Sequence, residues 1–161
     1  MKQTVQKRYF EEIEVGERYV SEGRTISESD IYTFAGLSGD FNRLHMNEEY
    51  MKNSIFGRRI AHGLLILAIQ SGLGAQIVRP DIAVMAFLGI SEWNFRKPVF
   101  IGDTIYVQIE IVEKRETSKP DRGIIVWQRT VFNQHDEVVQ DGKSLIMVHR
   151  KPKQADDILE K

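Results

Sequence analysis

The sequence has no cysteine, few prolines and no excess of either charge. Because none of its 161 residues is cysteine, disulfides, thiolate metal sites and a cysteine nucleophile are excluded. The 22 lysines and arginines are balanced by 23 aspartates and glutamates, which gives a formal net charge of -1. This balance argues against the basic surface that nucleic-acid binding requires. Any catalysis must therefore use oxygen and nitrogen groups.

Long apolar runs are also missing. The amino-terminal segment, MKQTVQKRYFEEIEVGE, has no apolar core, and no stretch approaches the roughly 20 apolar residues of a membrane span. We therefore expect a cytoplasmic protein. With 42% apolar residues, the chain suits a single compact domain. We place this domain at residues 9–150 and expect loose ends at residues 1–8 and 151–161.

Two helices are predicted in the first half of the chain. A capping box begins the first helix, with Ser27 as the cap and Asp30 three residues later. Gly39 suits a left-handed turn that ends this helix, which leaves residues 38–45 as a predicted loop. The second helix covers residues 63–78 and is apolar nearly all round. Other structure must therefore enclose it.

The second half of the chain supplies that enclosing layer. Four segments are rich in β-branched and aromatic residues and predict strands: residues 84–99, 104–115, 123–132 and 138–149. Short, polar, turn-like segments connect them, so we expect consecutive strands to be antiparallel neighbours. The sequence therefore predicts an α+β domain whose sheet covers one buried helix.

A carboxylate and an imidazole lie five residues apart in the predicted loop. A turn at Gly39 could bring the side chains of Asp40 and His45 to one cavity. Histidine titrates nearest neutrality, and a nearby aspartate can fix its tautomer or help it hold a water molecule. The same residues also suit a structural role, with Asp40 in a turn or cap and His45 as a hydrogen-bonded structural histidine.

The start of the second helix is a candidate oxyanion site. The N–H of Gly63 has no partner within the helix, and the helix dipole adds positive potential there. Alternatively, Gly63 only permits close packing, and His62 is either a structural residue or a second base. Ser71, two turns further along, could support the catalytic loop or donate back to the carbonyl of Leu67.

The remaining aromatic residues and histidines have simpler interpretations. Trp93, Phe95 and Trp127 are expected to be core or interface aromatics. His135 falls in a predicted turn and His149 near the end of the last strand, and no pair of histidines has the spacing typical of a zinc site. We therefore expect no catalytic metal.

Two linked motifs resemble a known family. Residues 37–45 (LSGDFNRLH) and 59–65 (RIAHGLL) resemble the signature of the MaoC-like dehydratases and (R)-specific enoyl-CoA hydratases, with the usual distance between them. Residues 93–99 (WNFRKPV) and 101–104 (IGDT) resemble the family's segment entering the long strands. The similarity covers about residues 9–150. The resemblance implies a hot-dog fold, in which a curved antiparallel sheet wraps a long helix, usually paired into a homodimer.

The resemblance also implies roles for particular residues. Asp40 and His45 become the catalytic acid/base pair, and the amide of Gly63 becomes the thioester oxyanion donor. Asn42 and Ser71 become supporting residues. Two positions depart from the family pattern: Arg43 replaces a common proline, and Asn47 stands where many members have aspartate. These differences bear on loop rigidity and substrate choice.

The implied reaction is reversible addition of water to a 2-enoyl-CoA, giving a 3-hydroxyacyl-CoA of (R) configuration. The CoA or carrier-protein thioester is part of the substrate, and no cofactor is expected. The phosphates of CoA favour cationic partners, for which the candidates near the motifs are Arg43, Arg58, Arg59 and Lys97. Two alternatives remain, a hot-dog acyl-CoA thioesterase and a non-catalytic acyl-thioester binding module.

Overall fold

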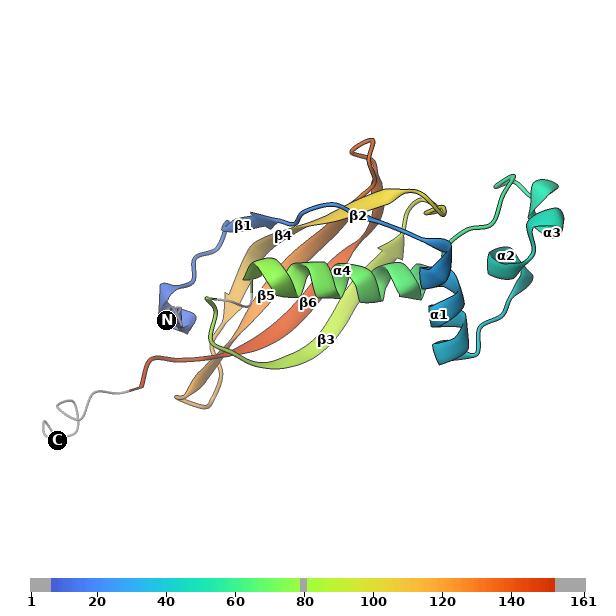
Figure 1. Cartoon of the computed structure of the whole chain (residues 1–161). Helices are drawn as coiled ribbons and strands as arrows, with labels where there is room; N and C mark the ends of the chain where they lie inside the picture. The colour runs from blue at the N-terminus through green and yellow to red at the C-terminus, as the bar shows by residue number, and fades with distance from the viewer. Residues whose placement is uncertain (1–6, 79–80, 153–161) are drawn as a thin grey trace, which may run out of the picture.

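The structure, a computed structural model, describes residues 7–78 and 81–152. Its elements, in chain order, are η1 (Phe10–Glu12), β1 (Arg18–Val20), β2 (Arg24–Thr25), α1 (Glu28–Ser38), α2 (Arg43–Met46), α3 (Glu48–Lys52), α4 (Gly63–Val78), β3 (Val84–Phe95), β4 (Thr104–Arg115), β5 (Arg122–Phe132) and β6 (Val138–His149). Figure 1 shows α4 lying along a curved sheet, with α1, α2 and α3 gathered at one end. The predicted α+β hot-dog class is confirmed.

Helix α4 has the limits that its sequence predicts, Gly63–Val78. Its apolar side chains pack against β4 and the neighbouring strands, and Ile66, Ile109 and Ile111 are at most 1% exposed. Burying such side chains contributes roughly 1.5–3 kcal/mol each, so this layer stabilises the domain. The sheet therefore encloses the helix as its apolar composition requires.

The sheet is antiparallel, with strand order β1-β4-β5-β6-β3, and β2 also pairs with β4. The prediction that consecutive strands are neighbours holds for β4, β5 and β6 but is wrong for β3, which pairs with β6 instead. The chain after β3 runs past the start of α4, where the amide of Ala61 donates to the carbonyl of Val99 over 2.7 Å. The chain then enters β4, which β5 and β6 separate from β3 in the sheet. Strand β3 ends at Phe95 rather than at residue 99.

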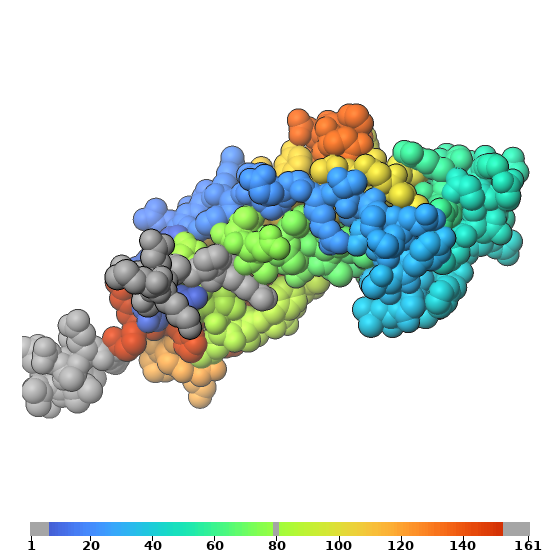
Figure 2. All heavy atoms as spheres, viewed as in Figure 1, coloured from blue at the N-terminus to red at the C-terminus, as the bar shows by residue number. Residues whose placement is uncertain are grey.

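The capping box and the left-handed turn of α1 are confirmed. The side chain of Ser27 accepts from the amide of Asp30, and Gly39 has φ 77°. The predicted loop at residues 38–45 is partly wrong, because α2 begins at Arg43 and includes His45. Asn42 explains this short helix, since its side-chain oxygen accepts from the amide of Leu44 over 3.0 Å. Figure 2 shows α1 to α3 projecting from one end of the molecule.

The two chain ends that were expected to be loose fall mostly on residues 1–6 and 153–161, which lie outside the described residues. Within the described part, Arg8 forms an ion pair with Glu17, and Lys151 forms one with Glu12. Across residues 7–78 and 81–152, no helix combines the length and apolarity that a membrane crossing needs. The cytoplasmic location stays a prediction.

Candidate active site

His45 presents one ring nitrogen toward a carboxylate. Its Nδ1 donates to the carbonyl of Ile60 over 2.8 Å, which places the lone pair of a neutral ring on Nε2. Nε2 lies 4.0 Å from Oδ2 of Asp40. This separation is too long for a direct hydrogen bond and suits a shared water molecule. The structure therefore brings the two predicted acid/base residues together.

Asp40 is placed by the turn that follows α1. Its carboxylate accepts from the backbone amide of Asn42 over 3.2 Å, and its side chain is half exposed. The amide side chain of Asn42 caps α2, so Asn42 orders the segment that connects the two acid/base residues. Asn47, the second departure from the family pattern, caps α3 by accepting from the amide of Tyr50 over 2.9 Å.

His62 contacts both His45 and Asp40 and holds them in position. Its Nε2 donates to the carbonyl oxygen of Asp40 over 2.9 Å, and its ring stacks on His45 with centroids 3.8 Å apart. The ring of Phe34 lies on it as well, 5.0 Å between centroids. Only 2% of His62 is exposed. These contacts favour a structural role over that of a second base.

Burial is the main influence on the charge of His45. It lowers the pKa of the ring, and the neighbouring His62 lowers it further. The carbonyl of Ile60 and the carboxylate of Asp40 raise the pKa, but the net shift is downward from the usual 6.5. His45 is therefore neutral at neutral pH and able to accept a proton.

A cavity of about 610 Å³ opens in front of His45. Its walls are mostly apolar and come from α2, the segment before α4, the start of α4, the end of β3 with the segment after it, and β6. The lining residues are His45, Phe56, Ile60, Ala61, Gly63, Leu64, Ile66, Phe95, Arg96, Lys97, Pro98, Val99 and Gln140. Gly63 begins α4 at this cavity, where a Cβ would lie only 2.6 Å from the ring of Phe95. Both interpretations of Gly63 therefore fit, because the glycine permits close packing and its amide starts a helix beside the cavity.

Sequence reasoning did not place two residues in this cavity. Phe95, expected to be a core or interface aromatic, is 58% exposed and lies over Gly63, so it is not part of the core. Gln140 is 2% exposed, donates to the carbonyl of Gly63 over 2.9 Å and accepts from the indole of Trp93 over 3.1 Å. No local pattern identifies Gln140, because its partners are 77 and 47 residues away. Trp127 belongs to the core, as expected, and the partly buried Trp93 packs against it.

The four cationic candidates lie in different surroundings. Lys97 lines the cavity and pairs with Glu137 over 2.6 Å. Arg43 and Arg58 lie over the rings of Tyr50 and Phe100, at 4.5 and 4.0 Å from the ring centres. The adjacent Arg96, which sequence reasoning did not consider, also lines the cavity and pairs with Asp141 over 2.6 Å.

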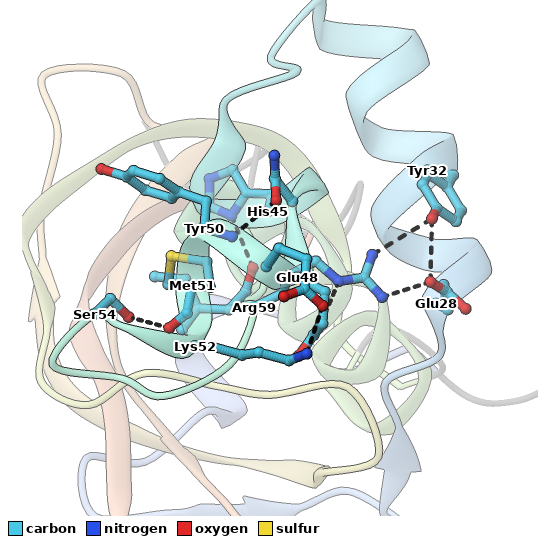
Figure 3. A network of polar contacts seen from close by, with 12 residues as sticks. Glu28, Tyr32, His45, Glu48, Tyr50, Met51, Lys52, Ser54 and Arg59 are labelled. Carbon is cyan, nitrogen blue, oxygen red and sulfur yellow. Dashed lines mark hydrogen bonds and ion pairs between the residues drawn. The ribbon is translucent and has the colours of Figure 1, made fainter.

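Arg59 has a structural position. Figure 3 shows its guanidinium between Glu48 of α3 and the pair Glu28 and Tyr32 of α1. Its distances to Glu28 and Glu48 are 2.6 and 2.8 Å, and hydrogen bonds to both carboxylates raise its pKa. Arg59 therefore ties α1 to the segment that carries His45.

Ser71 does not lie at the acid/base pair. It lines a second cavity further along α4, with Leu67, Gln70 and other residues. The supporting role of Ser71 for the loop of Asp40 and His45 stays a prediction.

One group of side chains could meet a metal ion. Candidate ligand atoms of Asp40, His45 and His62 lie within 4.8 Å of one another. The hydrogen bonds leave the lone pairs on Nε2 of His45 and Nδ1 of His62, and the second atom is buried. The absence of a catalytic metal stays a prediction.

The comparisons with known proteins identify the family of this chain. Residues 11–130 match the family described as "MaoC like domain". An (R)-specific enoyl-CoA hydratase from Rhodospirillum rubrum is 37% identical over 141 residues, covering 87% of this chain and 91% of the relative. A 3-hydroxybutyryl-CoA dehydratase from Methylorubrum extorquens is 35% identical, covering 89% of this chain and 85% of the relative.

A solved structure of another protein has a similar fold. The X-ray structure described as a monoamine oxidase regulatory protein from "Archaeoglobus fulgius" superposes with a TM-score of 0.88 at 38% identity, covering 92% of this chain and 99% of that chain. The chain belongs to the MaoC-like dehydratase family. The resemblance of its two motifs is thereby confirmed.

Proposed function

We propose that this protein is a hydro-lyase that adds water reversibly to a 2-enoyl-CoA and gives the (R)-3-hydroxyacyl-CoA. The observation that carries the proposal is the neutral, buried His45, whose free Nε2 lies 4.0 Å from the carboxylate of Asp40 beside the start of α4. The activities named for the relatives, enoyl-CoA hydratase and 3-hydroxybutyryl-CoA dehydratase, support this reaction class.

The proposed mechanism begins with one water molecule held between Asp40 and His45. His45 accepts a proton from this water as the oxygen attacks C3 of the enoyl thioester. The electron pair of the double bond moves toward the thioester carbonyl, where the amide of Gly63 and the helix dipole stabilise the developing negative charge. A proton then reaches C2 through the same pair. The sum is addition of H and OH across the double bond, with no change in redox state.

Two competing functions make different products. A thioesterase would direct water at the carbonyl carbon and release free thiol. A non-catalytic binding module would bind the thioester and change nothing. His45 directs its lone pair toward a carboxylate at the wall of an apolar cavity. This arrangement favours hydration over simple binding, because binding alone does not require an acid/base pair.

A panel of 2-enoyl-CoA substrates tests the proposal with purified protein. We expect loss of the absorbance of the conjugated enoyl thioester, without release of free thiol, and a product of (R) configuration by chiral analysis. Thiol release at the same rate would identify a thioesterase. Tight binding of the substrates with no turnover would identify a binding module.

A further inference from the structure

The carbonyl of Gly63 accepts a hydrogen bond from outside its own helix. Nε2 of Gln140, on β6, donates to it over 2.9 Å. Gln140 is 2% exposed and lines the cavity in front of His45. A buried amide in a mostly apolar wall is unfavourable unless its polar atoms have partners. The side chain of Gln140 therefore meets a specific need at the start of α4.

The amide of Gln140 has one orientation only. Its Oε1 accepts from the indole Nε1–H of Trp93 over 3.1 Å. An indole nitrogen only donates and a peptide carbonyl only accepts, so the oxygen must face Trp93 and the nitrogen must face Gly63. Among unbranched side chains of this length, only an amide supplies both an acceptor and a donor at neutral pH. The requirement at this position is therefore chemical as well as steric.

The sheet makes a local adjustment that places Trp93 beside Gln140. The pairing of β3 with β6 shifts register between residues 91 and 94, and Glu92 within this bulge has φ 55°. On β6, a Cβ at Gly142 would lie 2.4 Å from Cε3 of Trp93, so only glycine leaves room for the indole. Bulges and left-handed residues of this kind are typical of functional sites, where they redirect a side chain.

The start of α4 needs an external partner because its first residue is glycine. Glycine restricts the backbone less than other residues, and helix ends fray. A larger residue does not fit, since a Cβ at Gly63 would lie 2.6 Å from the ring of Phe95. Before the glycine, the amide of Ala61 donates to the carbonyl of Val99 over 2.7 Å. After it, Gln140 holds the carbonyl of Gly63. The amide of Gly63 therefore lies between two fixed points of the backbone.

We propose that Gln140 is a positioning residue, which holds the first turn of α4 so that the amide of Gly63 points at the thioester oxygen; this inference rests on the proposed function. Gln140 acts through the helix and not on the reacting atoms. Donors that stabilise a developing negative charge are most effective when they are oriented before the charge appears. Loss of this hydrogen bond should therefore affect the transition state more than the bound substrate.

Gln140→Met keeps the length of the side chain and removes the donor to Gly63. We expect kcat for hydration of a 2-enoyl-CoA to fall about tenfold or more, with a change in KM below about threefold. Both proteins are compared at a temperature where denaturant titration shows them fully folded. Gln76→Met, at an exposed position of α4, is the matched control and should keep the wild-type kcat. An unchanged kcat in folded Gln140→Met, whatever its KM, would overturn the inference.

Trp93→Phe tests the orientation of the amide and keeps an aromatic ring in place. It removes the indole N–H but leaves the donor of Gln140, so kcat should fall less than in Gln140→Met. Because both changes act on one hydrogen-bonded unit, the double variant should lose little beyond Gln140→Met alone. Losses of kcat that multiply in the double variant would contradict a joint role.

Amide hydrogen exchange tests the position of the helix without catalysis. The amide of Ile66 donates to the carbonyl of His62 over 3.2 Å in the first turn of α4. In Gln140→Met we expect this amide to exchange about tenfold faster by NMR, while the amides of α1 keep their wild-type rates. Equal exchange of Ile66 in the two proteins would overturn the inference.

The two readouts separate this inference from the proposed function. Hydration by the wild type with no effect of Gln140→Met on kcat would reject the positioning role alone. Faster exchange of Ile66 in Gln140→Met, with no hydration of any enoyl-CoA by the wild type, would reject the proposed reaction and leave the hold of Gln140 on α4 in place.

Discussion

His45 combines burial, a fixed tautomer and an open lone pair in one side chain. The hydrogen bond to Ile60 holds the proton on Nδ1, and burial lowers the pKa of the ring. A base with a lowered pKa stays neutral over a wider range of pH. This property is useful only if the lone pair reaches substrate, which the cavity in front of His45 allows.

The pH dependence of hydration should therefore report His45. We expect kcat/KM for a 2-enoyl-CoA to fall on the acid side with an inflection below 6.5, the usual histidine value, because protonation removes the lone pair. The lowered pKa also makes the free energy of unfolding depend on pH. The contribution of neutral His45 to that free energy is complete above the unfolded-state pKa and is lost as the pH falls toward the folded-state pKa. If kcat/KM instead falls on the acid side with an inflection well above 6.5, His45 is not the group that titrates.

Lys97 is the best placed of the cationic candidates for the phosphates of CoA. It lines the cavity, and its ion pair with Glu137 is about half exposed and hence weak. Lys97→Ala should raise KM several-fold and change kcat little, because it removes binding that is equal in the ground and transition states. Lys52→Ala, an exposed lysine paired with Glu49, is the control. An unchanged KM would remove Lys97 from the CoA site.

Local sequence patterns predicted the residues of the acid/base pair but not their surroundings. Asp40, His45 and Gly63 occur in short motifs, so they are recognisable without a fold. Gln140 gains its significance from a hydrogen bond to Gly63 of α4, which lies 77 residues away. Such contacts depend on how the sheet wraps the helix, and no local spacing encodes them.

At the scale of elements, the short strand β1 depends on a polar cluster. Burial raises the pKa of Glu17, but hydrogen bonds from Arg8 and Tyr19 outweigh it and lower that pKa to about 2. Burial and the neighbouring Glu17 raise the pKa of Tyr19 to about 12. The cluster holds the amino-terminal segment against the edge of the sheet, where β1 pairs with β4.

Glu17→Gln should lower the free energy of unfolding at neutral pH by roughly 1–3 kcal/mol, because the charged hydrogen bonds are lost. In the wild type, the contribution of Glu17 is complete above its usual pKa of 4.5 and is lost as the pH falls toward about 2. The variant should lack this part of the acid dependence. Denaturant titrations across that range measure both effects. Equal stability of the two proteins at neutral pH would show that the cluster contributes nothing.

The two longer helices, α1 and α4, were easier to predict than the short helices α2 and α3 or the strand pairing, for a physical reason. The limits of α4 follow from its continuous apolar sequence, and those of α1 from a capping box and a left-handed glycine. The pairing of β3 with β6 is a non-local choice that becomes clear only when the sheet must close around α4. Strands β1 and β2 have too few residues to show an alternation of apolar and polar side chains in the sequence.

At the scale of the whole molecule, β3 forms one edge of the sheet within residues 7–78 and 81–152, with β6 as its strand neighbour. Its exposed side chains include Phe87, Leu88 and Ile90, each at least 44% exposed. An open, apolar edge of this length is a site for pairing with another strand. A second copy of this chain could add its own β3 in a two-fold arrangement.

We therefore expect a homodimer or a higher oligomer in solution. Light scattering should give at least twice the chain mass of 18.6 kDa, and Leu88→Lys should shift the protein toward the monomer, because it places charge on the pairing edge. Lys143→Ala, on the neighbouring strand β6, is a surface control. A stable, fully active monomer at all working concentrations would contradict the prediction.

The most direct test of the account is hydration of a good enoyl-CoA substrate by Asp40→Asn, His45→Gln and the double variant. Each single change keeps the approximate size and should lower kcat by about 100-fold or more, and the double variant should lose little beyond the worse single one. Asp121→Asn and His149→Gln, at exposed positions at the opposite end of β5 and β6 from Gln140, are matched controls that should retain activity. If both Asp40→Asn and His45→Gln fold normally and hydrate the substrate at near wild-type kcat, the pair is not the catalytic centre.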